Sequence, residues 1–274
     1  MKKALSVVIL VLAFGMLWIF FGCIFMGHNS IENSILEQSS TENYTMDGLF
    51  PDPIYEAAIR MAIGKEFGEI TPEDCLDIRI LEIPWDNNHG SIEGIQYFVN
   101  LEEYTDASGY IKDISMLQGL ENLIKLDLSY NNIKDISVLE NISSLQYLDI
   151  SGNGLQDITP IAKLVNLTYL NLSYNRLNDF WSTRDLEPLV ALANLEWLGL
   201  HKSSVKDISA LSGLSNLRYL NIRENKVSNV ESLSKLQKLR DLYIEENPIS
   251  DEKVMKTLGH LTHLSIDIEV FLDY

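Results

Sequence analysis

Hydrophobic residues recur with a fixed period along most of the chain. Each repeat places apolar residues at offsets 0, 3, 6, 9 and 11, a polar residue at 14, and apolar residues again at 16 and 19. A unit this short cannot bury its apolar side alone, so stacked copies must share one core. The pattern predicts an α/β solenoid over residues 95–274, with about eight repeats and the last one incomplete. The windows are 22 residues apart, with one interval of 28, and begin at Ile95, Leu117, Leu139, Ile161, Leu189, Leu211, Leu233 and Met255.

Offsets 8 to 12 alternate between inward and outward positions, which indicates a short strand. Offsets 9 and 11 carry the inward leucines and isoleucines, whereas offsets 8, 10 and 12 face outward. One strand per repeat predicts a parallel sheet on the concave side of the solenoid. The six extra residues of the long interval, near 181–186, are expected to form a convex-side loop that the solenoid tolerates.

The polar residue at offset 14 is usually asparagine and is expected to be structural. A buried amide at that turn can bond to the backbone of its own coil and of the neighbouring coil. Aspartates such as Asp113 and Asp135 are expected to cap the short helical turn that follows. The asparagine column consists of Asn131, Asn153, Asn175, Asn225 and Asn247, and Ser203 interrupts it.

The pattern changes before the first repeat. Residues 50–94 are predicted to form a small helical cap that covers the apolar edge of the solenoid. Asp52 can cap a helix that starts at Pro53, and a second helix is expected after Thr71. The apolar face of the first helix is expected to contain Ile54, Ala58 and Met61.

The N-terminal residues 1–27 are predicted to attach the protein to a membrane. Residues 4–26 contain no charge and follow two lysines, yet no A-x-A-like cleavage site follows, so simple secretion is the weakest interpretation. Cys23 after Gly22 resembles the end of a lipoprotein signal, in which the cysteine is lipidated. The uncharged run also exceeds the ~20 residues that span a bilayer. Both remaining interpretations place the rest of the chain outside the cytoplasm, tethered through a flexible polar segment at 28–49.

Composition and motifs exclude several classes of function. The net charge of -18 argues against nucleic acid as a partner. With Cys23 in or at the membrane, Cys75 has no partner for a disulfide and is expected to be a packed apolar residue. The sequence contains no H-E-x-x-H, phosphate-binding loop or G-x-S-x-G motif, so we expect no enzyme, metal or cofactor.

The outward strand positions are the candidate functional surface. Four consecutive repeats carry an aromatic residue at offset 8, and exposed aromatic residues within a polar rim are typical of protein interfaces. The alternative is that these rings only stack on one another and stiffen the sheet. The predicted partner-binding residues are Tyr147, Tyr169, Trp197, Tyr219, Tyr243, Asn171, Asn221, His201 and Arg223.

The expected partner is a protein or peptide. A glycan is the second possibility, because tyrosine and tryptophan faces beside Asn and Asp also suit sugar rings. An intracellular repeat scaffold is a further alternative, and the apolar segment at 4–26 argues against it.

The repeats and the segments before them resemble a known family. The period and the recurring "IKDIS", "LQDIT" and "VKDIS" are similar to the leucine-rich repeat, and "FPDP", "IYEAAIRMAIG", "EFGE" and "ITPEDC" resemble the N-terminal cap of the internalins. The resemblance implies a leucine-rich repeat horseshoe in a bacterial surface or secreted protein that binds ligands without catalysis. The sequence shows no immunoglobulin-like domain after the repeats and no LPxTG-type sorting signal, so host-cell invasion is not part of this expectation.

Overall fold

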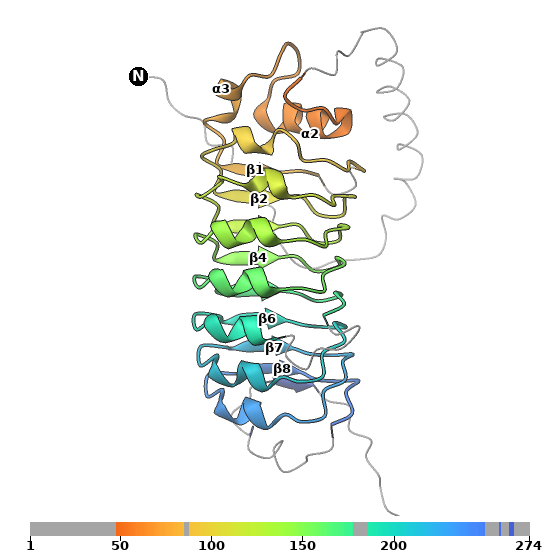
Figure 1. The fold of residues 1–274 in the computed structure, drawn as a ribbon, viewed down its shortest axis with the longest axis vertical. Helices are drawn as coiled ribbons and strands as arrows, with labels where there is room; N and C mark the ends of the chain where they lie inside the picture. Colours follow the sequence, from red (N-terminus) through yellow and green to blue (C-terminus); the bar gives the residue numbers. More distant parts are fainter. Residues whose placement is uncertain (1–47, 85–87, 178–185, 250–257, 259–262, 266–274) are drawn as a thin grey trace, which may run out of the picture. The chain divides into compact units, whose positions relative to one another are not determined.

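The computed structural model describes residues 48–84, 88–177, 186–249, 258 and 263–265. Nine short parallel strands form one sheet and follow one another in sequence order (Figure 1). The predicted parallel sheet of a solenoid is therefore confirmed. The strands are β1 (Ile80–Glu82), β2 (Glu103–Thr105), β3 (Lys125–Asp127), β4 (Tyr147–Asp149), β5 (Tyr169–Asn171), β6 (Trp197–Gly199), β7 (Tyr219–Asn221), β8 (Asp241–Tyr243) and β9 (His263–Ser265).

A row of short 3-10 helices accompanies the sheet, one helix to a coil (Figure 1). The expected aspartate caps are present, since the Oδ1 atoms of Asp113 and Asp135 each accept an N–H two residues later at 2.8 Å. These hydrogen bonds lower the pKa of both carboxyl groups. Asp157 and Asp207 make the same contact. The helices are η1 (Ile95–Tyr97), η2 (Ser115–Leu117), η3 (Ser137–Asn141), η4 (Thr159–Lys163), η5 (Glu187–Ala191), η6 (Ser209–Gly213) and η7 (Glu231–Lys235).

The core is one continuous column of side chains that extends from Phe50 to Leu258. The inward strand leucines, such as Leu148 and Leu198, are fully buried. The long repeat interval does not interrupt the sheet, because β5 and β6 pair with Tyr169 opposite Trp197. Most of the extra residues lie outside the described part of the chain.

The asparagine column forms a buried ladder between coils, as the sequence predicts. The Nδ2 group of Asn153 donates to the carbonyls of Leu128, Ile150 and Ser151 at 3.0 to 3.1 Å. Its Oδ1 atom accepts the N–H of Ile133 at 2.9 Å. One side chain thus satisfies backbone groups in two coils and fixes their spacing. The same pattern occurs at Asn131, Asn175, Asn225 and Asn247.

Ser203 replaces an asparagine in this column and keeps one of the hydrogen bonds between coils. Its hydroxyl is fully buried and donates to the carbonyl of Leu172 at 2.9 Å, with a second contact to the carbonyl of His201 at 3.1 Å. A hydroxyl therefore replaces the donor part of the amide at this position.

A second asparagine row, at offset 5, was not predicted. These side chains are mostly exposed, and each makes one bond to the preceding coil; Asn166, for example, donates to the carbonyl of Ser143 at 2.9 Å. The recurring "NL" dipeptide was the available signal. The row contains Asn100, Asn122, Asn166, Asn194 and Asn216.

The predicted cap helices are present as α2 (Pro53–Ile63) and α3 (Pro72–Cys75). The Oδ1 atom of Asp52 accepts the first free N–H groups of α2, and Thr71 with Asp74 forms a capping box at α3. Cys75 is buried, as expected, and burial raises the pKa of its thiol to about 11, so it is not a reactive thiolate at neutral pH.

The expected apolar face of α2 is wrong at two of its three residues, since only Ala58 is buried. Ile54 and Met61 are 45% and 76% exposed, and the buried residues are Tyr55, Ala58 and Ile59. The helix is apolar on two adjacent faces, so periodicity could not choose between them. The choice depends on Tyr55, which buries a large ring and finds a hydrogen-bond partner for its hydroxyl.

That partner belongs to a buried polar network that the sequence did not predict. The Tyr55 hydroxyl lies 3.1 Å from that of Tyr104, which donates to Asp106, and Asp106 also contacts Nε2 of His89 at 2.9 Å. His89 and Asp106 are each 1% exposed. Burial lowers the pKa of His89, but the contacts with Asp106, together with smaller contributions from Ser91 and Asp52, raise it, and the net result is a pKa above the usual value. The network joins the cap to β2, and β1 of the predicted cap region already belongs to the sheet.

The N-terminal predictions are not tested by the structure. Residues 1–27, Cys23 and nearly all of the expected tether lie outside the described residues. None of the described helices has the length and apolar composition of a membrane span.

We expect Asn153→Ala to destabilise the protein far more than Asn166→Ala. The first change leaves several buried carbonyl and amide groups without a partner, at about 1–3 kcal/mol each, whereas the second removes one exposed hydrogen bond. Urea denaturation should show a loss of at least about 3 kcal/mol in the unfolding free energy for Asn153→Ala, and less than about 1 kcal/mol for Asn166→Ala. Equal losses would contradict a structural role for the buried ladder.

Candidate binding surface on the sheet

The four predicted aromatic residues at offset 8 form a continuous stack, here called the aromatic ladder: Tyr147, Tyr169, Trp197 and Tyr219. The ring centroids are 4.1, 4.2 and 4.7 Å apart in order, and the ring planes differ by 7° to 14°. The residues face one another directly in the register of β4 to β7. Parallel strands lie about 4.8 Å apart, which is close to the stacking distance of aromatic rings. Strand spacing therefore builds the stack.

The two ends of the aromatic ladder are also occupied. The Nζ atom of Lys125 lies 5.6 Å from the ring centroid of Tyr147, and the ring of Tyr243 lies 5.3 Å from that of Tyr219, tilted by 41°. The inner rings are thus covered on both faces. All four residues remain half-buried. What the aromatic ladder presents to a partner is a line of ring edges and hydroxyl groups.

Gly199 makes room for the largest ring. A Cβ atom at this position would lie 2.8 Å from two carbons of the Trp197 indole and 2.5 Å from Oδ1 of Asn171. The indole therefore lies along its own strand, over the backbone of Gly199. The sequence shows this glycine at offset 10, but only the structure shows its purpose.

The tyrosine hydroxyls of the aromatic ladder stay protonated at neutral pH. Burial raises the pKa of Tyr147, Tyr169 and Tyr219, and the nearby carboxylates of Asp149 and Asp127 raise those of Tyr147 and Tyr169 further. A protonated hydroxyl can donate one hydrogen bond and accept others. Within the aromatic ladder the hydroxyls of Tyr147 and Tyr169 already bond to each other, so a partner must use the hydrogen-bonding capacity that remains.

The offset-10 side chains form a polar strip beside the aromatic ladder. Oδ1 of Asn171 accepts the N–H of Ser173 at 3.1 Å, and its Nδ2 donates to Oδ2 of Asp149 at 2.9 Å. Asn221 accepts the N–H of Arg223 in the same way. The predicted contact residues Asn171 and Asn221 are therefore held in place by internal hydrogen bonds. Burial raises the pKa of Asp149 above its usual value, against hydrogen bonds that lower it.

Offset 12 was expected to face outward, and this is largely wrong. Ser129, Ser151 and Ser173 are 7%, 3% and 7% exposed, because the chain has already turned toward the buried asparagine two residues later. The hydroxyl of Ser151 donates to Asp149, and Ser173 accepts the N–H of His201.

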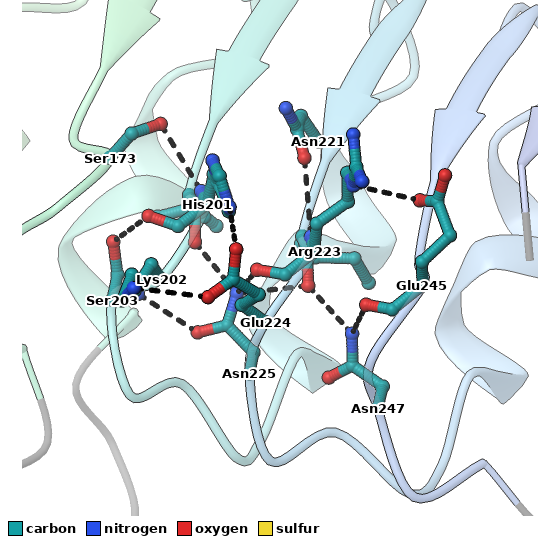
Figure 2. A network of polar contacts seen from close by, with 12 residues as sticks. Ser173, His201, Lys202, Ser203, Asn221, Arg223, Glu224, Asn225, Glu245 and Asn247 are labelled. Carbon is teal, nitrogen blue, oxygen red and sulfur yellow. Dashed lines mark hydrogen bonds and ion pairs between the residues drawn. The ribbon is translucent and has the colours of Figure 1, made fainter. Parts of the chain in front are cut away.

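His201 and Arg223, two predicted contact residues at this offset, each contact a glutamate side chain (Figure 2). Nε2 of His201 lies 2.8 Å from Oε1 of Glu224, and Nζ of Lys202 lies 3.2 Å from Oε2 of the same residue. Nε of Arg223 lies 3.2 Å from Oε2 of Glu245. These contacts hold both predicted residues at the C-terminal ends of β6 and β7.

A second set of exposed aromatic residues was missed from the sequence. Tyr130 and Tyr174, here called the rim row, lie at offset 13 and are 55% and 42% exposed. Their rings lie 6.4 Å apart, and the ring of Tyr174 meets that of His201 at 4.8 Å. The available signal was the repeated "SYN" before the asparagine column.

The surface has the chemistry of a binding face. Among the described residues, no group of three or more His, Cys, Asp or Glu is arranged to hold a metal ion. Asp127 and Asp149 are opposite each other in β3 and β4. Aromatic edges, hydroxyls and fixed amides beside them can hold another molecule by contact area and hydrogen bonds.

We expect Gly199→Ala to disturb the aromatic ladder through Trp197. The added methyl group would overpack the indole and destabilise the fold by about 1–3 kcal/mol. In a Trp197→Ala background the same change should cost at least ~1 kcal/mol less, because the clash with the indole is gone. A double-mutant cycle by chemical denaturation measures this coupling. Purely additive losses would show that the indole does not depend on Gly199.

Two family models for leucine-rich repeats match the chain. One, described as two copies of the repeat, matches residues 143–189, and the other matches residues 113–155 and 193–249. A search of curated protein sequences finds no match.

Solved structures resemble the chain over most of its length. Internalin C2 of Listeria monocytogenes is 31% identical, with a TM-score of 0.74 over 80% of this chain and 95% of that one. The internalin InlF of the same organism is 26% identical, with a TM-score of 0.54 over 80% and 76%. A plant peptide hormone receptor, solved with its ligand RGF2, shares the fold at 18% identity and a TM-score of 0.57, over 72% and 33% of the two chains. From the repeats, the cap and the match to internalin C2, we conclude that the chain belongs to the internalin family of leucine-rich repeat proteins.

Proposed function

We propose that this protein is a non-enzymatic, extracytoplasmic binding protein that holds a protein or peptide partner on its sheet, with the aromatic ladder as anchor. The observation that carries the proposal is the row of half-buried aromatic edges on a surface that the core does not require. The leucine-rich repeat fold commonly serves as a scaffold for protein–protein interaction, and the plant receptor in complex with RGF2 has this fold.

The aromatic ladder supports a protein or peptide over a glycan. A sugar ring packs against an open aromatic face, but the faces of Tyr169 and Trp197 are covered by neighbouring rings at 4.1 to 4.7 Å. Ring edges carry the positive side of the aromatic quadrupole and suit carbonyl oxygens and other ring faces. Peptides supply both.

The stacked rings also stiffen the sheet, which is the alternative interpretation given from the sequence. The two roles are compatible, because a stack that is rigid before binding loses little side-chain entropy when a partner arrives. Hot-spot residues are usually ordered in this way near the centre of an interface, as Trp197 is ordered between Tyr169 and Tyr219.

We also propose that residues 1–27 anchor the protein to the outer side of the bacterial cell membrane, through a lipid on Cys23. Gly22 and Cys23 at the end of the uncharged run motivate this assignment. Cys23→Ala should abolish metabolic fatty-acid labelling and weaken membrane retention. If the wild-type protein takes up no labelled fatty acid and the Cys23→Ala variant is retained in the membrane as well as the wild type, the segment is a membrane span instead.

We expect Trp197→Ala to remove binding without unfolding the protein. Random linear peptides are selected on the full chain, and the affinity of the enriched peptides is compared between variants by calorimetry. Trp197→Ala should weaken the binding of these peptides by more than about 2 kcal/mol, or roughly 30-fold in affinity. Leu198→Ala, its inward neighbour, should instead cost ~2–5 kcal/mol of unfolding free energy.

Val190→Ala is the matched control, since Val190 is 51% exposed on η5, away from the strands. It should change neither affinity nor stability. Peptides that bind the Trp197→Ala protein as well as the wild type would contradict the proposed binding surface.

A further inference from the structure

The rim row lies in a backbone conformation that tyrosine adopts at a cost in free energy. The φ angles of Tyr130 and Tyr174 are 56° and 58°, in the left-handed region that favours glycine and asparagine. Their N–H groups donate to carbonyls of the next coil at 2.7 Å, so the conformation is part of the connection between coils.

The fold requires this conformation but not an aromatic side chain. The same offset carries serine, glycine, lysine and glutamate in other coils, all with positive φ. Tyrosine at two of these positions is therefore not explained by the turn or, given its exposure, by the core. The positions are Ser108, Tyr130, Gly152, Tyr174, Lys202, Glu224 and Glu246.

The rings of the rim row are not stacked face to face, in contrast to those of the aromatic ladder. The planes of Tyr130 and Tyr174 differ by 41°, and Tyr174 meets His201 edge-on at 62°. The ring of Tyr130 leans over Gly152, where a Cβ atom would lie 2.6 Å from Cδ1 of the ring. One side of that ring is thus supported by the backbone, while the residue as a whole is more than half exposed.

Negative charge lies between the two aromatic sets. Asp127 and Asp149 occupy offset 10, between the aromatic ladder at offset 8 and the rim row at offset 13. Asp149 is close enough to both sets to contribute, after burial, to the raised pKa of Tyr130 and of Tyr169. Within the described chain no ion pair forms to either aspartate.

The cations of this surface are already paired. The Nζ atom of Lys125 lies 3.6 Å from a carboxylate oxygen of Glu103. Lys202 lies 3.2 Å from a carboxylate oxygen of Glu224, and Arg223 lies 3.2 Å from one of Glu245. The surface therefore has uncompensated negative charge beside two exposed tyrosine rings, on a chain with a net charge of -18. Lysine and arginine side chains are the groups that fit both features.

We propose that the rim row is a second line of contact for the protein segment held by the aromatic ladder. Lysine or arginine side chains of that segment cross Asp127 and Asp149, here called the aspartate strip, and contact Tyr130 and Tyr174. This inference rests on the proposed function and names the class of partner. The partner crosses from offset 8 to offset 13 of the middle coils, so it covers the ends of the strands as well as their centres.

The test uses the peptides selected on the full chain and a double variant, Tyr130→Asn with Tyr174→Asn. Asparagine favours the left-handed conformation, so this variant should be at least as stable as the wild type by thermal melting. The enriched peptides should be rich in lysine or arginine, and the double variant should bind them at least about tenfold more weakly.

A charge variant tests the aspartate strip separately. Asp127→Asn keeps an Oδ1 acceptor for the N–H of Ser129, as Asn171 does for Ser173 two coils later. The variant should bind lysine-containing peptides several-fold more weakly than the wild type at low salt. Its affinity for versions of the same peptides with glutamine in place of lysine should be unchanged. Val190→Ala serves again as the control.

The outcomes separate the two proposals. Selected peptides that lack basic residues, or that bind the rim double variant at wild-type affinity while Trp197→Ala abolishes binding, would overturn the inference and leave the proposed function intact. Failure to select any peptide whose binding needs Trp197 would contradict the proposed function, and the inference with it.

Discussion

The buried asparagine ladder is the interaction on which the rest of the structure depends. Each amide bonds to carbonyl groups of its own coil and to a carbonyl and an N–H of the preceding coil. A turn in the interior would otherwise leave these groups unpaired, which a coil of this length could not offset with its own core. Where an asparagine occupies the column, it thus turns the chain at the same point of the repeat and brings the strands into register.

Register, in turn, produces the binding surface. Because β4 to β7 pair residue for residue, aromatic residues at one offset lie at the strand spacing and stack. A shift of one residue in any coil would turn its aromatic side chain into the core and an inward leucine to solvent. The interior of the coils therefore determines how the rings are displayed, even though no ladder asparagine needs to touch a partner.

Much of this could be predicted from the sequence, because the repeat averages over local ambiguity. Eight windows agree on which offsets are inward, so the sheet, the asparagine column and the aspartate caps follow from periodicity. A single element has no such averaging. The face of α2 was predicted wrongly for this reason, since Ile54 and Met61 match the helical period as well as Tyr55 and Ile59 do.

The candidate site was predicted only in part. The line of Tyr147, Tyr169, Trp197 and Tyr219 follows from strand alternation, but alternation ends where the chain turns. Offset 12 was therefore placed outward although Ser151 is buried, and the tyrosines of the rim row were overlooked because their left-handed backbone belongs to no regular pattern. Contacts between coils, such as the indole of Trp197 over Gly199, depend on side-chain conformation, which periodicity does not specify.

Hydroxyl-radical footprinting of the full chain, with and without a selected peptide, locates the bound partner on the surface of the protein. It reports the solvent exposure of individual side chains, and the molecule supplies its own references in Tyr110 and Met61, which are 55% and 76% exposed away from the aromatic ladder. A peptide held on the aromatic ladder should slow the oxidation of Tyr169, Trp197 and Tyr219 and leave that of the two references unchanged. Unaltered oxidation of the aromatic ladder, with slowed oxidation of Met61 on the cap, would contradict the proposed binding surface.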